Sequence, residues 1–140
     1  MKIDSIVNGV TIDHITAGKA MLLYELLDLD ELDCTVAIIK NVTGKQGKKD
    51  IIKIDAEIPV NLDVVGYVDP GATVNIIRDG KVAEKLRLDL PERLVNVLKC
   101  RNPRCISGTE QELDHIFKLT DKENKVYRCL YCEAQAKETK

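Results

Sequence analysis

The sequence predicts an α+β fold, in which an antiparallel sheet carries two helices on one face and a small all-β module follows. Two observations favour the sheet and its helices. Apolar residues alternate in some segments and recur at helical spacing in others, and their order is strand, helix, two strands, helix, two strands. A third observation sets the module apart, because four of the five cysteines lie beyond residue 99.

The first predicted strands flank Asn8-Gly9, a dipeptide suited to the positive φ angles of a type I′ turn. Ile3–Val7 and Val10–Ile15 would form this hairpin. A helix is expected from Thr16, as its capping residue, to about Leu29, because five leucines form one stripe at helical spacing.

The next segments predict a strand, a loop and a second strand. Cys34–Lys40 is almost entirely apolar and predicts a buried strand, whereas Val42–Lys49 contains two glycines and predicts a loop. In Ile51–Glu57 apolar and charged residues alternate, so Ile52 and Lys53 should point to opposite faces of a sheet.

A short helix and a second hairpin complete this part of the chain. Leu62–Val68 predicts the helix, and Ala72–Arg78 and Lys81–Leu88 flank Asp79-Gly80, a strong hairpin signal. The full order predicts a ferredoxin-like sandwich. Because Pro91 restricts the backbone just before the cysteines, we expect one domain at residues 1–92 and a second at 93–140.

Composition excludes several classes of function. The formal net charge of −2 disfavours a general nucleic-acid binder, because such binding depends on cations that meet phosphates. No apolar run approaches the roughly 20 residues that span a bilayer, so no membrane association is expected. The N-terminus lacks the apolar stretch of a signal peptide, which predicts a cytoplasmic protein.

The strongest chemical signal is Cys100-x4-Cys105 followed by Cys129-x2-Cys132. Each close pair presents two sulfurs from a turn, and two such turns complete a tetrahedron. Four thiolates leave no open position for an activated water, so the predicted site is structural. Zn²⁺ is the preferred ion, one per chain, although four thiolates also bind iron. The predicted module is a rubredoxin-like zinc ribbon.

Other interpretations of the cysteines are weaker. Disulfides do not suit a chain without an export signal, and a module of this size usually needs a metal to fold. Cys34 lies in an apolar segment and is expected in the core. His115 is an alternative ligand, but four thiols already complete the site.

Taken singly, the remaining polar residues indicate no function, and the sequence chemistry alone ends at an acidic α+β domain plus a zinc module. Several segments together, however, resemble the regulatory chain of aspartate carbamoyltransferase, in the family's order and over essentially the whole chain. Besides the four cysteines, the segments are Gly9–Ile15, Gly47–Ile54, Ala72–Asn75 and Leu90–Arg93.

The resemblance implies a non-catalytic subunit of pyrimidine biosynthesis, whose N-terminal allosteric domain binds CTP, ATP or UTP. It also implies a regulatory-chain homodimer, paired through that domain, and a zinc domain that contacts the catalytic chain. The nucleotide would lie near Asp13 at the ribose, Lys53 at the base and ribose, and Lys85 at the triphosphate. The other residues implied at this site are His14, Lys49, Asn75, Val82, Ile6 and Ile77.

Two alternatives come from other classes of protein. A zinc-ribbon protein that binds nucleic acid would use the cations of residues 99–140, but nine Lys and Arg against seven Asp and Glu leave a balance of only +2. An enzyme that acts alone is a weaker alternative, because nothing in the sequence resembles a nucleophile paired with a base.

Overall fold

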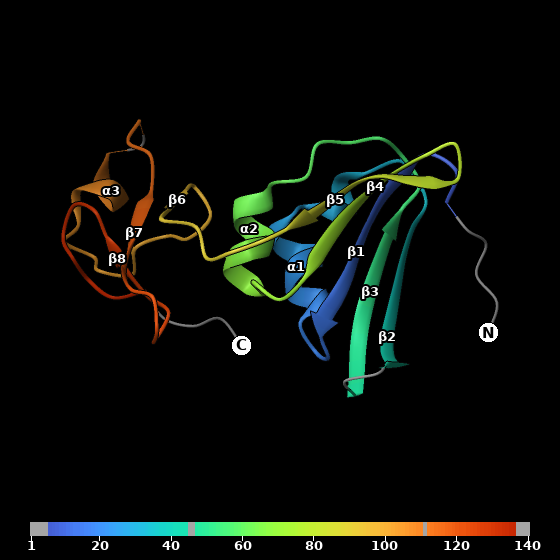
Figure 1. Cartoon of the computed structure of the whole chain (residues 1–140). Coiled ribbons are helices and arrows are strands. Elements are labelled where there is room, and N and C mark those ends of the chain that lie inside the picture. The colour runs from blue at the N-terminus through green and yellow to red at the C-terminus, as the bar shows by residue number, and fades with distance from the viewer. Residues whose placement is uncertain (1–5, 45–46, 111, 137–140) are drawn as a thin grey trace. The chain divides into compact units, whose positions relative to one another are not determined.

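The protein is described by a computed structural model that covers residues 6–44, 47–110 and 112–136 (Figure 1). The chain divides into two compact units, Met1–Asp89 and Leu90–Lys140. Each unit has its own sheet, and each is described by itself below.

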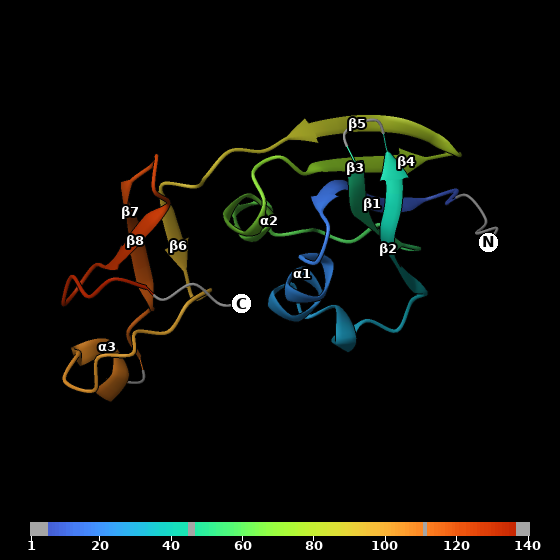
Figure 2. The ribbon, with the colours of Figure 1, turned by 90° about the horizontal axis from the view of Figure 1, so that it is seen from below.

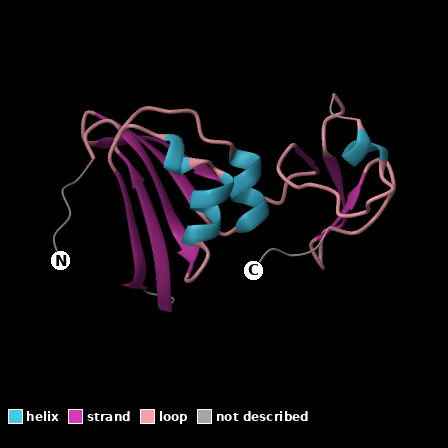
Figure 3. Cartoon of the chain, turned by 180° about the vertical axis from the view of Figure 1, so that it is seen from behind, coloured by secondary structure: helices cyan, strands magenta, loops and turns pink. Residues whose placement is uncertain are grey.

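The N-terminal unit is a five-stranded antiparallel sheet in the order β2-β3-β1-β4-β5. Both α-helices cover the same face of this sheet (Figures 2 and 3). The predicted α+β, ferredoxin-like class is confirmed. In chain order the elements are β1 (Gly9–Thr16), α1 (Ala20–Leu26), the 3-10 helix η1 (Leu29–Glu31), β2 (Val36–Gly44), β3 (Gly47–Ile54), α2 (Leu62–Val68), β4 (Thr73–Arg78) and β5 (Lys81–Arg87).

The core of this unit lies between the sheet and the two helices. Ile12 and Ile15 of β1 and Ile52 and Ile54 of β3 are fully buried there. Lys53, between the two isoleucines of β3, lies on the other face of the sheet. The alternation in the sequence therefore separates an apolar, helix-covered face from a polar one.

Two predicted elements are confirmed at nearly every residue. The helix α2 spans Leu62–Val68, and the Asn61 side chain caps it by accepting hydrogen bonds from the N–H groups of Asp63 and Val64. The β4–β5 hairpin turns at Asp79-Gly80, where both residues have positive φ (53° and 75°), as a type I′ turn requires.

The predicted N-terminal hairpin is wrong. β1 pairs with β3 on one side and β4 on the other, which leaves it no free edge for Ile3–Val7, most of which lies outside the described residues. Gly9 belongs to β1 and is not among the glycines with positive φ. A Cβ at this position would collide with the Ile54 carbonyl oxygen, so glycine here allows β1 and β3 to approach closely.

The predictions between Thr16 and Lys49 also need correction. Thr16 ends β1, and α1 begins only at Ala20, because Gly18 turns the chain with φ of 97°. Most of the predicted loop Val42–Lys49 is strand: residues 42–44 of β2 pair with residues 47–49 of β3, and residues 45 and 46 lie outside the described part of the chain. β2 is an edge strand of intermediate exposure rather than a buried strand, and Cys34, half-buried, precedes it.

The C-terminal unit is a small antiparallel sheet in the order β6-β7-β8 with one turn of helix, which agrees with the predicted all-β class. Its elements are β6 (Arg93–Val95), α3 (Ile106–Thr109), β7 (Ile116–Asp121) and β8 (Val126–Cys129). Leu94, Phe117 and Tyr127, one from each strand, are its largest fully buried side chains among the described residues. Across the described part of both units, no helix has the length and hydropathy to cross a bilayer.

Candidate functional site

The sulfur atoms of the four C-terminal cysteines lie within 4.8 Å of one another. The Sγ atoms of Cys100 and Cys132 are 3.5 Å apart, and those of Cys105 and Cys129 are 3.6 Å apart. A tetrahedral ion with metal–sulfur bonds of about 2.3 Å requires sulfurs separated by about 3.8 Å. The cluster therefore fits one tetrahedral ion.

Backbone turns hold the cysteines in place. The N–H of Cys105 donates to the carbonyl of Asn102, which closes the turn between the first two cysteines. At the end of β8 the N–H of Cys129 donates a hydrogen bond to the carbonyl of Ala134, and the N–H of Glu133 donates one to the carbonyl of Cys129. Each turn presents two sulfurs to the same point, as the sequence spacing predicts.

The thiols differ in their tendency to ionise. The backbone N–H of Ala134 lowers the pKa of the Cys132 thiol to about 6, with a further contribution from the Asn102 side chain. Burial raises the pKa of the Cys100 thiol to about 12. Because metal ions bind thiolates rather than thiols, a cation that binds this cluster would displace the protons that remain on it.

Two groups considered from sequence lie outside this cluster. His115 is not part of it, and Cys34 belongs to the other unit. One contact was missed: the Ser107 hydroxyl lies 3.1 Å from the Cys105 sulfur. The sequence signal was weak, since it was only a serine two residues after a ligand.

The open face of the large sheet carries a row of polar residues that crosses four strands. Cross-strand pairing places Lys53 of β3 beside Thr11 of β1, Thr11 beside Asn75 of β4, and Asn75 beside Lys85 of β5. The Asn75 amide donates to the Thr11 hydroxyl at 3.3 Å. Three residues that are far apart in the chain, Lys53, Asn75 and Lys85, are thus brought into one line.

A second group of polar residues lies around Asp13, which follows Thr11 on the same face of β1. Asp13 pairs with Thr73 of β4, and its Oδ1 accepts hydrogen bonds from Lys49 Nζ (2.9 Å) and from the N–H of His14 (2.7 Å). Burial of Asp13 raises the pKa of its carboxyl group, but the two hydrogen bonds together with the positive charge of Lys49 outweigh burial, so that the pKa lies below the ordinary value.

A β-bulge in β1 sets the direction of the His14 side chain. The register between β1 and β3 shifts between Ile12 and Ile15, and His14 takes a positive φ of 59° within that shift. Bulges of this kind redirect a side chain at the rim of a sheet. Nδ1 of His14 lies 3.4 Å from the Thr73 hydroxyl, so the imidazole stays at the edge of the polar face.

The opposite end of the same face is apolar. Ile77 of β4 pairs with Gly9 of β1 and with Val82 of β5. Ile77 is 8% exposed and Val82 is 56% exposed, and Ile6, of intermediate exposure, lies beside Gly9. Ile6, Ile77 and Val82, three of the residues implied at the site, therefore lie together beside the polar row, on the side away from Asp13.

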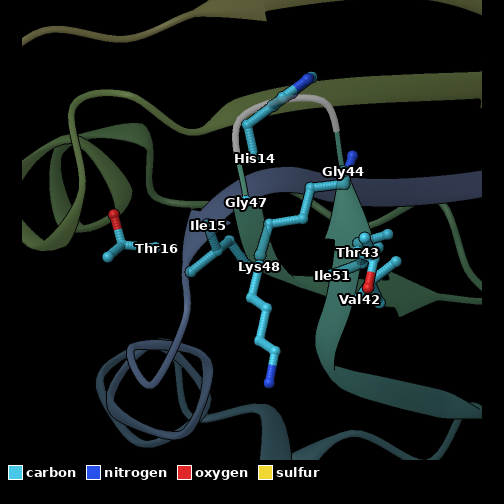
Figure 4. Close-up of a pocket in the computed structure, with 10 residues that line it drawn as sticks. His14, Ile15, Thr16, Val42, Thr43, Gly44, Gly47, Lys48 and Ile51 are labelled. Carbon is cyan, nitrogen blue, oxygen red and sulfur yellow. The ribbon is translucent and has the colours of Figure 1, made fainter.

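A cavity of about 820 Å³ opens between the end of β1 and the β2–β3 hairpin (Figure 4). Of the residues implied at the nucleotide site, only His14 and Lys49 line it, together with Lys48. Lys53, Asn75 and Lys85 lie outside it on the open sheet face, so the structure places the implied residues in two adjoining areas.

An α+β domain with an open polar sheet face, joined to a four-cysteine module, defines a two-domain protein with a metal-binding C-terminal domain. Residues 1–89 match the family model "Aspartate carbamoyltransferase regulatory chain, allosteric domain", and residues 92–140 match the corresponding "metal binding domain". The chain therefore belongs to the aspartate carbamoyltransferase regulatory chain family and is a regulatory, non-catalytic subunit.

Curated relatives agree with this assignment, and all of those described here are named aspartate carbamoyltransferase regulatory chain. The relative from Clostridium tetani is 45% identical over 135 residues, covering 95% of this chain and 94% of its own length. One from Clostridium botulinum strain Hall is 44% identical over 134 residues (95% and 92%). One from Bifidobacterium longum is 42% identical over 138 residues (98% and 99%). Membership favours the regulatory interpretation over a nucleic-acid-binding zinc ribbon.

Proposed function

We propose that this chain binds CTP, ATP or UTP on the open face of its large sheet and transmits the effect to a separate catalytic chain. The observation that carries the proposal is the row Lys53, Thr11, Asn75 and Lys85, with a cation at each end. The two lysines are three strand spacings apart, about 14 Å at roughly 4.8 Å each.

Charge supports an anionic ligand at the β5 end of the row. Lys85 and Arg87 alternate along β5 and share the outer face with Asn75 and Thr73, their partners on β4. This end of the face is basic although the whole chain has a net charge of −2. A triphosphate requires such a group of cations, so we propose that the phosphates lie near Lys85 and the base and ribose near Lys53.

Asp13 and the apolar residues of the face support the proposed positions of the ribose and the base. Both hydrogen bonds to Asp13 described above end on Oδ1, so that Oδ2 is suited to accept a ribose hydroxyl. Ile6 and Ile77 would form an apolar wall beside Gly9 of β1, Val82 would line the same region, and His14 and Lys49 would border the ribose. Binding sites commonly combine an apolar slot with a few fixed polar groups.

In the C-terminal unit we propose one structural Zn²⁺ held by Cys100, Cys105, Cys129 and Cys132. The support is the fit of the sulfur cluster to a tetrahedron without an open position. When bound, zinc supplies folding free energy, which a unit of this size needs because its apolar core is small. Free thiols of this kind suit the reducing cytoplasm, where we place the protein.

The proposed partners are the aspartate carbamoyltransferase catalytic chain and a second copy of this chain. A nucleotide that binds one global state of the assembly more tightly shifts the assembly toward that state, and substrate alters nucleotide affinity reciprocally. For the homodimer, the support is the β2 edge of the large sheet, where Ala37, Ile38 and Ile39 succeed one another, whereas the β5 edge is charged.

Calorimetric titration of the full chain with CTP and ATP tests the nucleotide site. Lys53→Ala and Lys85→Ala should each weaken binding by about tenfold to a hundredfold, because a hydrogen bond to a charged group contributes roughly 1.5–3 kcal/mol. Lys118→Ala, an exposed change in β7 of the other unit, is the matched control. Unchanged affinity in both sheet variants would contradict the site.

Metal content and assembly test the rest of the proposal. Freshly purified, reduced protein should contain one equivalent of zinc, and Cys129→Ser should lose it. The intact chain should co-purify with the catalytic chain and make its activity respond to CTP and ATP. Salt-dependent binding of DNA or RNA, with no response to nucleotides, would instead support the zinc-ribbon alternative.

A further inference from the structure

The four cysteines of the C-terminal unit do not share one environment. Cys105 and Cys129 are each 2% exposed, whereas Cys100 and Cys132 are of intermediate exposure. The cluster therefore has a closed side and an open side. On the open side, water can hydrogen-bond to a sulfur, but on the closed side only protein groups can.

One side-chain hydroxyl reaches the closed side. Ser107 is 3% exposed, and its Oγ lies 3.1 Å from the Sγ of Cys105, within hydrogen-bond distance for sulfur. A sulfur that is bound to a metal ion has lost its proton, so the hydroxyl must be the donor in the loaded protein. A buried hydroxyl without an acceptor would be costly, which gives the contact a definite direction.

We propose that Ser107 is a positioning residue for the metal, whose hydroxyl donates a hydrogen bond to the Cys105 thiolate and so slows loss of the ion. The proposal rests on the zinc site proposed above and extends it to a residue outside the four ligands. Groups that hydrogen-bond to metal ligands fix the ligand's orientation, and their removal typically costs about 10–100-fold in metal affinity.

The backbone around Ser107 shows why the side chain can be tested separately from the turn. The N–H of Cys105 donates to Asn102, and the N–H of Gly108 donates to the Cys105 carbonyl, both at 3.0 Å. These bonds do not involve the serine hydroxyl. Ser107→Ala should therefore keep the turn and the four sulfurs but remove the hydroxyl that donates to Cys105.

The experiment uses the full chain loaded with Co²⁺, whose absorption reports on thiolate ligands. In Ser107→Ala we expect release to a competing chelator to be about tenfold faster. We also expect the sulfur-to-cobalt charge-transfer band to move to lower energy, because a hydrogen bond stabilises the sulfur electrons. Thr109→Val is the matched control, since it removes an exposed hydroxyl of the same short helix that donates to the Ile106 carbonyl.

Ser107→Thr separates the hydroxyl from packing. The proposal is supported if Ser107→Thr keeps the native rate of Co²⁺ release and the native spectrum while Ser107→Ala changes both. It is also supported if Ser107→Ala fails to bind Co²⁺ while Ser107→Thr binds it. Equal impairment of the two variants, or Ser107→Ala behaving like Thr109→Val, would overturn it. A native chain that gives no tetrahedral cobalt spectrum would instead refute the zinc site itself.

Discussion

At the scale of single residues, the N-terminal unit depends on a carboxylate that is fully buried. Asp50 of β3 is 0% exposed. Its Oδ2 accepts the N–H groups of Gly18 (2.9 Å) and Ala20 (3.3 Å), and its Oδ1 accepts that of Asn41 (3.0 Å). One side chain thus joins the start of α1 and the irregular part of β2 to the strand that carries Lys49.

Asp50→Ala should lower the free energy of unfolding by about 3 kcal/mol or more, because each buried donor left without an acceptor costs roughly 1–3 kcal/mol. Urea unfolding followed by circular dichroism measures the change. Asp55→Ala, an exposed aspartate just beyond the same strand, should change stability by less than about 0.5 kcal/mol. Equal effects of the two substitutions would show that the three bonds contribute little.

The Asp13–Lys49 pair predicts a dependence on pH. Because the folded-state pKa of Asp13 is lowered, the stability that its ionisation contributes is present above the unfolded pKa of about 3.9. That stability is lost as pH falls through the folded value. Carboxyl NMR titration should show the Asp13 pKa rising in Lys49→Ala, where the hydrogen bond is lost and burial remains. Lys48→Ala, a neighbouring exposed lysine, should leave it unchanged.

Single residues were predictable where their chemistry is local. The four cysteines could be grouped from their spacing, and the outward direction of Lys53 followed from its alternation with Ile52 and Ile54. Asp50 could not be singled out, because its partners lie 9 to 32 residues away and depend on how β1, β2 and β3 pair. Ser107 was missed because its role depends on which sulfur is buried.

At the scale of elements, predictions held where local chemistry and tertiary pairing agree. Asn61 caps α2, and Asp79-Gly80 turns the β4–β5 hairpin. The predictions failed where the pairing of strands, rather than local sequence, decides the conformation. Asn8-Gly9 has the composition of a turn, but pairing of β1 on both sides requires Gly9 to be extended. Gly44 and Gly47, whose presence predicted a loop, are instead the last residue of β2 and the first residue of β3, and they pair with each other.

The β2 edge carries a prediction about assembly. Ala37→Lys should convert the proposed homodimer to monomers at micromolar concentration, because a lysine on an edge strand opposes pairing with another strand. Ala83→Lys makes the same change on β5 at the other edge of the sheet, and it should leave the dimer intact. Sedimentation velocity distinguishes the two results. A dimer in both variants would place the contact between copies elsewhere.

At the scale of the whole molecule, the two units are connected by the segment after Asp89. The hydroxyl of Tyr127 donates to the carbonyl of Pro91 at 2.6 Å, and the Tyr127 side chain is 2% exposed. The N–H of Leu119 likewise donates to the carbonyl of Glu92. Pro91 and Glu92, which follow Asp89 closely, are therefore fixed to the strands of the C-terminal unit.

Tyr127→Phe should weaken the response of the catalytic chain to CTP and ATP, with zinc content, assembly and nucleotide affinity preserved. The substitution removes one hydrogen bond of about 1 kcal/mol and keeps the buried ring. Coupling between sites is typically about 1–3 kcal/mol, so a loss of this size would reduce the effect of a nucleotide by up to about fivefold. Tyr131→Phe is the control: it removes a hydroxyl that donates to the carbonyl of Asp114 within the same unit, and it should leave the response intact.

Two outcomes would contradict this role of Tyr127. If both variants keep a full response, the signal does not pass through the hydrogen bond between Tyr127 and Pro91. If Tyr127→Phe loses zinc or fails to assemble, that bond instead stabilises the C-terminal unit.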